Sequence, residues 1–115
     1  MCTKEKLKLK LKINREFAMN MWGDSYGTAT SAKDLFGYRM NKANYGQAGE
    51  GGWNIHHIIP KAKGGKDSLN NLMLVSMKAH NQIGDKTTFA IDGKYYQATW
   101  SKKRQKYEYV EIEYV

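Results

Sequence analysis

Apolar and polar residues follow several different spacings along this chain. In residues 6–13, leucines and an isoleucine alternate with lysines, and this period of two predicts a half-exposed strand, with an amphipathic helix as the competing interpretation. In residues 14–22 the apolar residues recur at helical spacing, and Gly23 is placed to end a helix. Residues 24–31 are rich in Gly, Ser and Thr and predict a loop, followed by a short ordered piece around residues 35–40.

The middle of the chain predicts two strands followed by a helix. Residues 53–59 are apolar and β-prone, and Pro60 ends this run. Residues 61–67 have the composition of a turn-rich loop, and the apolar pattern resumes in residues 69–75. Residues 76–84 then predict a short helix with Gly84 as its C-terminal stop.

The C-terminal region reads as antiparallel β-structure. Residues 87–91 and 94–100 flank Asp92-Gly93, and Asp-Gly between two β-rich runs is a strong hairpin signal. Residues 107–115 alternate again, with two glutamates on one face. Because opposite charges on paired strands attract, we expect this last strand to pair with the lysine-rich strand at the N-terminus. The simplest interpretation of the C-terminal region, residues 87–115, is structural.

Composition narrows the class of protein. A chain of 115 residues, 41% hydrophobic and 26% charged, favours one globular domain over residues 1–115. No apolar run approaches the roughly 20 residues that span a bilayer, and we expect no membrane partner. Cys2 is the only cysteine, so no intrachain disulfide is possible, and a reducing cytoplasm is the expected location. The chain has 19 Lys plus Arg against 11 Asp plus Glu, a net charge of +8, which suits binding to a polyanion.

The three histidines bear on which reaction the chain could catalyse on a bound polyanion. Hydrolysis of a phosphodiester needs a deprotonated water, stabilisation of the negative charge on the phosphate, and neutralisation of the departing oxygen. A histidine can serve as the base, and a divalent metal ion can supply the other two. His56 and His57 are adjacent, and His80 follows the predicted second strand. Adjacent side chains on a strand point to opposite faces, so a bend near Pro60 is needed to bring both histidines to one phosphate.

Several short motifs in this region occur together in the order and spacing of a known family. They are the run 52–60 (Gly-Trp-Asn-Ile-His-His-Ile-Ile-Pro), Gly64-Gly65, Asn70-Asn71-Leu72, His80-Asn81 and Gly84-Asp85. Together they resemble the motif of the HNH endonucleases, also called ββα-metal or His-Me finger nucleases. The similarity extends upstream through Asp34-x-x-Gly37 and Tyr45-Gly46 and covers about residues 34–86, with the motif core at about residues 52–86.

The resemblance implies a fold class and a set of roles. The expected fold is α+β, with a β-hairpin and a helix around one metal ion, an N-terminal helical or strand region and C-terminal antiparallel strands. His57 takes the position of the general base, and His56 and His80 take those of the metal ligands. Asn71 matches the asparagine that braces the loop and holds the base histidine, with Asn70 as a neighbouring alternative. Four lysines near the motif are expected to contact phosphates: Lys61, Lys63, Lys66 and Lys78.

The resemblance also bears on cofactor and substrate. The expected cofactor is one divalent ion, Mg, Mn, Ni or Zn, and imidazole ligands suit the transition metals better than Mg. Ser76 and Ala79 occupy positions where many relatives have zinc-binding cysteines, so no structural zinc is expected. The implied function is hydrolysis of DNA, most simply double-stranded DNA, in a phage or mobile-element setting. Two alternatives remain open: an HNH-like nucleic-acid-binding module without catalysis, and a phage-type protein inhibitor or effector, for example of a CRISPR nuclease, which would have a protein partner.

Overall fold

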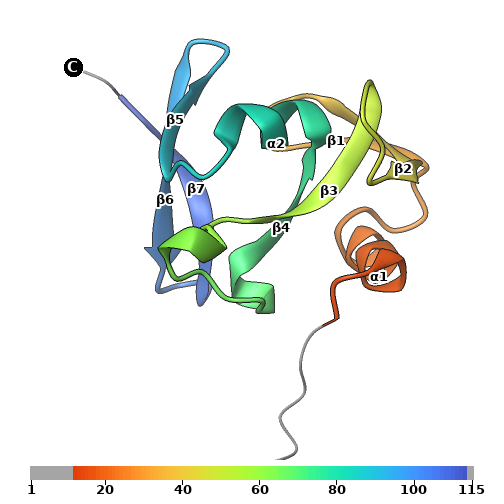
Figure 1. Ribbon diagram of the computed structural model, residues 1–115, viewed down its shortest axis with the longest axis horizontal. Helices are drawn as coiled ribbons and strands as arrows, with labels where there is room; N and C mark the ends of the chain where they lie inside the picture. Colours follow the sequence, from red (N-terminus) through yellow and green to blue (C-terminus); the bar gives the residue numbers. More distant parts are fainter. Residues whose placement is uncertain (1–11, 114–115) are drawn as a thin grey trace, which may run out of the picture.

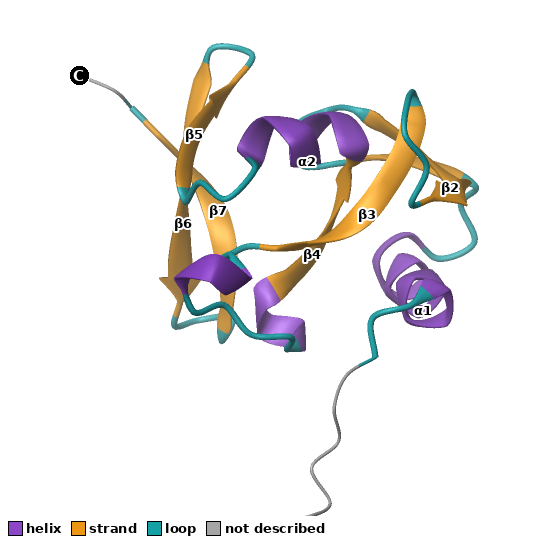
Figure 2. Cartoon of the chain, viewed as in Figure 1, coloured by secondary structure: helices purple, strands orange, loops and turns teal. Residues whose placement is uncertain are grey.

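The computed structural model describes residues 12–113, which form an α+β structure with two α-helices and two sheets (Figure 1). In chain order the elements are α1 (Arg15–Tyr26), β1 (Ser31–Lys33), β2 (Arg39–Tyr45), β3 (Gly51–His57), the 3-10 turns η2 (Lys61–Lys63) and η3 (Leu69–Asn71), β4 (Leu72–Ser76), α2 (Met77–Ile83), β5 (Thr88–Ile91), β6 (Lys94–Ser101) and β7 (Lys106–Ile112). The two sheets lie on either side of α2, which connects them in sequence (Figure 2).

The first sheet has the strand order β1-β2-β3-β4. β1 and β2 are antiparallel, β2 and β3 are parallel, and β3 and β4 are antiparallel. β4 leads directly into α2, so β3, β4 and α2 correspond to the two predicted strands and the helix, although residues 69–71 of the second predicted strand form the 3-10 turn η3. Ser76 caps the helix by accepting a hydrogen bond from the backbone of Ala79 at 3.0 Å, and Gly84 follows its last residue.

The N-terminal helix is longer than its sequence pattern indicated. Asn14 caps α1 by accepting a hydrogen bond from the Phe17 backbone at 2.9 Å, as expected for a helix that starts there. The predicted end at Gly23 is wrong, and so is the loop assignment of residues 24–26. The helix continues to Tyr26 and stops at Gly27, which has a φ of 62° and whose N–H bonds to Gly23 O. A glycine inside a helix costs stability but does not force an end.

The C-terminal sheet has the order β5-β6-β7 and is antiparallel throughout. The β5–β6 turn consists of Asp92 and Gly93, both with positive φ (51° and 81°), so the hairpin predicted from Asp-Gly is confirmed. The predicted pairing of the last strand with residues 6–13 lies largely outside the described residues, and within residues 12–113 β7 pairs with β6.

Two apolar clusters hold the structure together. In one, α1 packs on the first sheet through Trp22, Met40 and Trp53, all fully buried. In the other, α2, Val75 of β4 and Ile58, the residue after β3, pack against the inner face of the C-terminal sheet. Phe89, Tyr96 and Tyr109 come from that inner face. The β3-β4-α2 unit therefore shares a core with the C-terminal sheet, which fixes the position of β7 relative to the histidines. No helix among the described residues is long and apolar enough to cross a membrane.

Candidate functional site

The side chains of His56 and His80 meet between β3 and α2. His56 is the penultimate residue of β3 and is 3% exposed, and His80 lies in the last turn of α2. Their rings are perpendicular, and the two Nδ1 atoms are 3.1 Å apart. The β4 strand and the Ser76 cap bring α2 back over the end of β3, so residues 24 positions apart in sequence become neighbours.

The other ring nitrogen of His56 contacts the C-terminal sheet. His56 Nε2 lies 2.7 Å from the hydroxyl of Tyr109 on β7, and the same hydroxyl donates to Ile58 O at 3.4 Å. Burial raises the pKa of Tyr109 above its usual value, so this side chain is a neutral phenol. Because the hydroxyl proton goes to the Ile58 carbonyl, the oxygen is left to accept a proton from Nε2. This arrangement places the lone pair of His56 on Nδ1, facing His80.

The charge state of His56 suits a metal ligand. Burial lowers its pKa to about 4, and His80 and His57 contribute to the lowering. His56 is therefore neutral at neutral pH, which a ligating imidazole must be. With metal–nitrogen bonds of about 2.0–2.1 Å, two imidazoles on one ion place their nitrogens about 3.0–3.4 Å apart. The observed 3.1 Å fits this range. Within residues 12–113 no group of three or more His, Cys, Asp or Glu side chains is arranged to hold an ion, so this pair would be the protein's contribution.

His57 has a different partner from its neighbour. It is the last residue of β3, and its Nε2 lies 2.6 Å from Asp67 Oδ1 in the following loop. The second carboxylate oxygen accepts a hydrogen bond from Lys61 Nζ at 3.3 Å. The hydrogen bond from His57, followed by Lys61, holds the pKa of Asp67 below its usual value. The side chain of His57 is 22% exposed, so part of the ring remains accessible to solvent.

Asn71 closes the loop that holds Asp67. Its side chain is 2% exposed, and its amide both accepts and donates hydrogen bonds. Its Oδ1 accepts from Ile59 N at 2.8 Å, and its Nδ2 donates to Ile59 O at 3.0 Å and to Lys66 O at 3.1 Å. Asn70 is exposed and accepts a hydrogen bond from Ser68. The geometry thus gives the bracing contacts to Asn71 rather than to Asn70.

Gly64 and Gly65 supply the turn in that loop, as their sequence position suggested. Gly64 has a φ of 92°, in the region that disfavours side chains. Gly65 donates from its N–H to Pro60 O at 2.9 Å. A Cβ at Gly65 would lie 1.7 Å from Ile59 O. This close approach requires glycine, and it returns the chain so that Lys66 and Asp67 lie beside β3.

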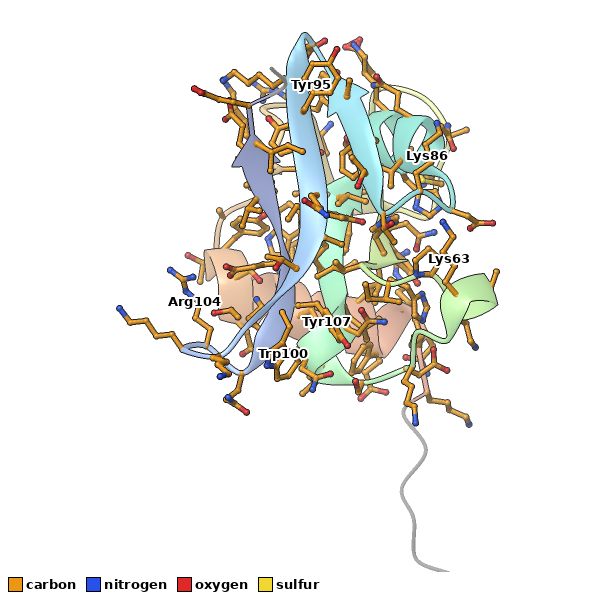
Figure 3. All side chains as sticks on the ribbon, turned by 90° about the vertical axis from the view of Figure 1, so that its left-hand side faces the viewer. Lys63, Lys86, Tyr95, Trp100, Arg104 and Tyr107 are labelled. Atoms are coloured by element: carbon orange, nitrogen blue, oxygen red, sulfur yellow. The ribbon has the colours of Figure 1, made fainter. Side chains whose placement is uncertain are left out.

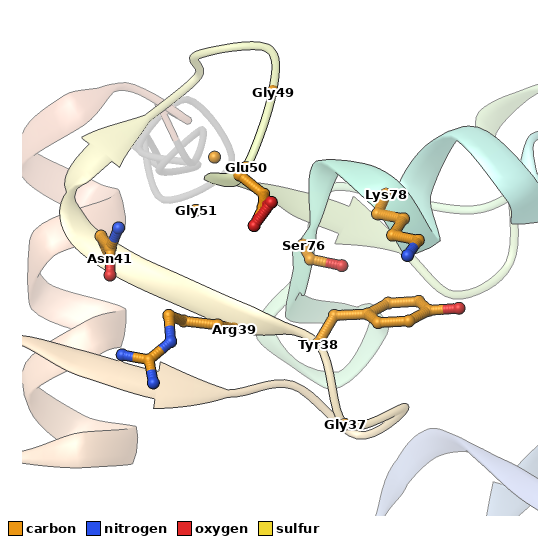
Figure 4. Close-up of a pocket in the computed structure, with 10 residues that line it drawn as sticks. Gly37, Tyr38, Arg39, Asn41, Gly49, Glu50, Gly51, Ser76 and Lys78 are labelled. Carbon is orange, nitrogen blue, oxygen red and sulfur yellow. The ribbon is translucent and has the colours of Figure 1, made fainter.

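The four lysines predicted to contact phosphates do not form one group. Lys61, Lys63 and Lys66 are exposed on the loop that also carries Asp67. Lys78 lies on α2, where its Nζ is 4.6 Å from the centre of the Tyr38 ring. Figure 4 shows it beside a different hollow, which Glu50 also lines. Three of the four lysines therefore share the loop that follows His57, and Lys78 lies elsewhere.

A buried carboxylate ties the upstream motif to the site. Asp34 is 6% exposed and accepts hydrogen bonds from the backbones of Phe36 and Tyr38 through Oδ1 and from Ser76 through Oδ2. The turn around Gly37, which the sequence motif Asp34-x-x-Gly37 marked, therefore anchors the start of α2. This contact positions the helix that carries His80.

The sequence interpretation missed two residues of the site. Asp67 stands among lysines, ten residues after His57, and an acidic residue in an otherwise basic loop was the available signal. Tyr109 had no such signal, because it is one of several tyrosines in an alternating β-run. Its contact with His56 depends on how the C-terminal sheet packs, which no local pattern records.

Comparisons with known proteins agree with the motif. Residues 46–86 match the family model described as HNH endonuclease, and the recognition of this family in the sequence is thereby confirmed. Over 59 residues, 51% of its length, the chain is 37% identical to "Probable mobile endonuclease C" of Enterobacteria phage T4. The matched region is 28% of that protein, so the chain spans well under half of this relative. No solved structure gives a significant match.

Proposed function

Starting from the HNH endonuclease match of residues 46–86, we propose that this chain is a metal-dependent endonuclease that hydrolyses phosphodiester bonds in DNA. The observation that carries the proposal is that the adjacent histidines His56 and His57 have different partners. His57 is oriented by Asp67 at 2.6 Å, while His56 and His80 face each other across 3.1 Å. The first pair suits a general base, and the second suits a metal ion.

His57 would act as the base through Nδ1. With the proton on Nε2 donated to the Asp67 carboxylate, the lone pair lies on the opposite ring nitrogen. A neutral imidazole can take a proton from water in this way. Asp67 has two effects: it selects this tautomer, and its negative charge stabilises the imidazolium that forms when the water gives up its proton. Asn71 and Gly65 hold the loop so that Asp67 stays in reach.

His56 and His80 would hold the divalent ion through their Nδ1 atoms. When bound, such an ion supplies stabilisation of the negative charge on the phosphate and on the departing 3′ oxygen. Two neutral imidazoles suit Mn, Ni or Zn better than Mg. The Tyr109 hydroxyl keeps the lone pair of His56 directed at the site.

The loop lysines would position the DNA. Lys61, Lys63 and Lys66 are exposed on the loop that follows His57, and contacts from such side chains to phosphates fix the register of the backbone without reading bases. Affinity built on these contacts falls steeply as salt rises. Lys61 has a second contact, with Asp67, so its loss would also affect the orientation of the base.

A supercoiled-plasmid assay tests the proposal. We expect the protein to nick the plasmid with Mn, Ni, Zn or Mg and to stop on addition of EDTA. His57→Ala should abolish nicking, whereas Lys94→Ala, at an exposed position of the β5–β6 hairpin, should cut like the wild type. Binding without cleavage under every metal would refute the nuclease and favour the binding module. Neither binding nor cleavage would favour the protein-directed inhibitor.

A further inference from the structure

One exposed aromatic side chain lies where the C-terminal sheet extends past the core. Along β6, Tyr96, Ala98 and Trp100 share the inner face. Tyr96 is 8% exposed and belongs to the core, whereas Trp100 is 39% exposed. Its cross-strand partner is Tyr107, whose ring packs edge-on against it with centroids 4.9 Å apart. Figure 3 shows the two rings together at the end of the sheet where the β6–β7 turn lies.

The ring of Trp100 lines a cavity together with the loop that carries Lys66 and Asn71. Trp100 and Tyr107 line one side of a hollow of about 320 Å³, and Ile59, Gly65, Lys66 and Asn71 line the other. The volume lies at the lower end of the range of about 300–1000 Å³ that is usual for small-ligand pockets. Lys66 and Asn71 belong to the loop that orients His57 through Asp67. The hollow is therefore continuous with the loop beside the candidate base.

The surroundings of the hollow are strongly basic. The turn that follows Trp100 contains Lys102, Lys103 and Arg104, all exposed. Arg104 is paired with Glu108 at 3.1 Å, while neither lysine forms an ion pair within residues 12–113. Lys66 adds a positive charge on the opposite wall. A half-exposed indole between cationic side chains is the combination that binds a nucleobase and the phosphates on either side of it.

We propose that this hollow, lined by Trp100, Tyr107 and Lys66, is a binding site for an unpaired nucleotide of the DNA substrate. The unpaired base stacks on Trp100, and its phosphates lie between Lys66 and the β6–β7 turn. A base inside a duplex cannot reach the ring, because both of its faces are already stacked. The site would therefore favour DNA with a bulged or displaced nucleotide close to the scissile phosphate. This inference rests on the proposed function for the position of the cut, but not for binding itself.

Measurements of DNA binding under conditions without cleavage test the nucleotide site separately from the nuclease activity. In EDTA, the dissociation constants of a fluorescein-labelled duplex with a one-nucleotide bulge and of the matched perfect duplex are measured by fluorescence anisotropy. We expect the wild type to prefer the bulged duplex, and Trp100→Ala to weaken binding of that duplex by about 5- to 150-fold, the range for loss of one base stack. Trp100→Phe should keep most of the preference. Tyr95→Ala, on the outer face of the same strand, is the matched control and should keep all of it.

Tryptophan emission gives a second readout. Trp22 and Trp53 are fully buried, and Trp100 is the remaining one of the three tryptophans. We expect the bulged duplex to quench the emission of the wild type, and to quench the Trp100→Phe variant far less. The proposal is overturned if Trp100→Ala binds both duplexes as the wild type does, even when the protein cuts plasmid. It stands if the preference depends on Trp100, even when no cleavage is found.

Discussion

Replacing Tyr109 by Phe tests whether the C-terminal sheet supports the proposed metal site. The change removes one oxygen atom that lies 2.7 Å from His56 Nε2 and leaves the ring in the core. His56 is 3% exposed, so water cannot easily replace the lost partner. An unsatisfied buried polar group costs about 1–3 kcal/mol. Removing a hydrogen-bond partner that orients a metal-ligating histidine typically lowers metal affinity about 10- to 100-fold.

Isothermal titration calorimetry measures the Mn²⁺ affinity of wild type and Tyr109→Phe. Urea unfolding in EDTA measures the stability of both proteins without metal. We expect weaker Mn²⁺ binding and a free energy of unfolding lower by about 1–3 kcal/mol. Tyr107→Phe is the matched control, because it removes a hydroxyl from the same strand, two residues away, without touching His56. Equal Mn²⁺ affinity in the wild type and Tyr109→Phe would show that the hydroxyl does not orient the ligand.

Further variants and conditions test the loop and the buried histidine. Asp67→Asn should lower the cleavage rate by at least tenfold and leave the Mn²⁺ affinity unchanged. The upper limit of the effect is about 10²–10⁴-fold, the rate that is lost when a general base is removed completely. An unchanged rate would exclude Asp67 from the mechanism. Asn71→Ala should lower the free energy of unfolding by about 1–3 kcal/mol because Ile59 loses both of its partners; urea unfolding measures this, and equal midpoints would contradict it. In EDTA, the free energy of unfolding should fall by up to about 3 kcal/mol from pH 6.5 to pH 4. The reason is that the pKa of His56 is about 4 in the folded chain, so over this interval the unfolded chain binds a proton at His56 and the folded chain does not. His56→Asn should flatten that slope, and a wild-type stability that does not change over this interval would refute the buried neutral histidine.

Elements with local signals were predictable from the sequence. The Asp92-Gly93 turn and the short helix between Ser76 and Gly84 each depend on residues within a few positions of each other, and both are present. The motif also singled out His56 and His80, whose rings the structure brings within 3.1 Å. Such features follow from backbone preferences and from short-range capping.

Features that depend on long-range packing were not predictable. The parallel pairing of β2 with β3 joins strands through a glycine-rich connection whose sequence shows only a loop. Tyr109 meets His56 across 53 positions, because the inner face of β7 shares a core with α2. The alternation in residues 107–115 gave two possible faces, and only the packing of the sheet selects the one that points to the site. Trp100 packs on Tyr107 of the neighbouring strand and stays 39% exposed, which depends on where the sheet extends past the core.

The roles proposed for His57 and His80 are separated by the dependence of the single-turnover cleavage rate on Mn²⁺ concentration, measured for wild type, His57→Ala and His80→Ala on one plasmid. His57 is the proposed base, and His80 is a proposed metal ligand. We predict that His57→Ala lowers the plateau rate by about 10²–10⁴-fold at an unchanged Mn²⁺ midpoint, whereas His80→Ala moves the midpoint to higher Mn²⁺. A His57→Ala variant that reaches the wild-type plateau once enough Mn²⁺ is added would contradict the assignment of the base.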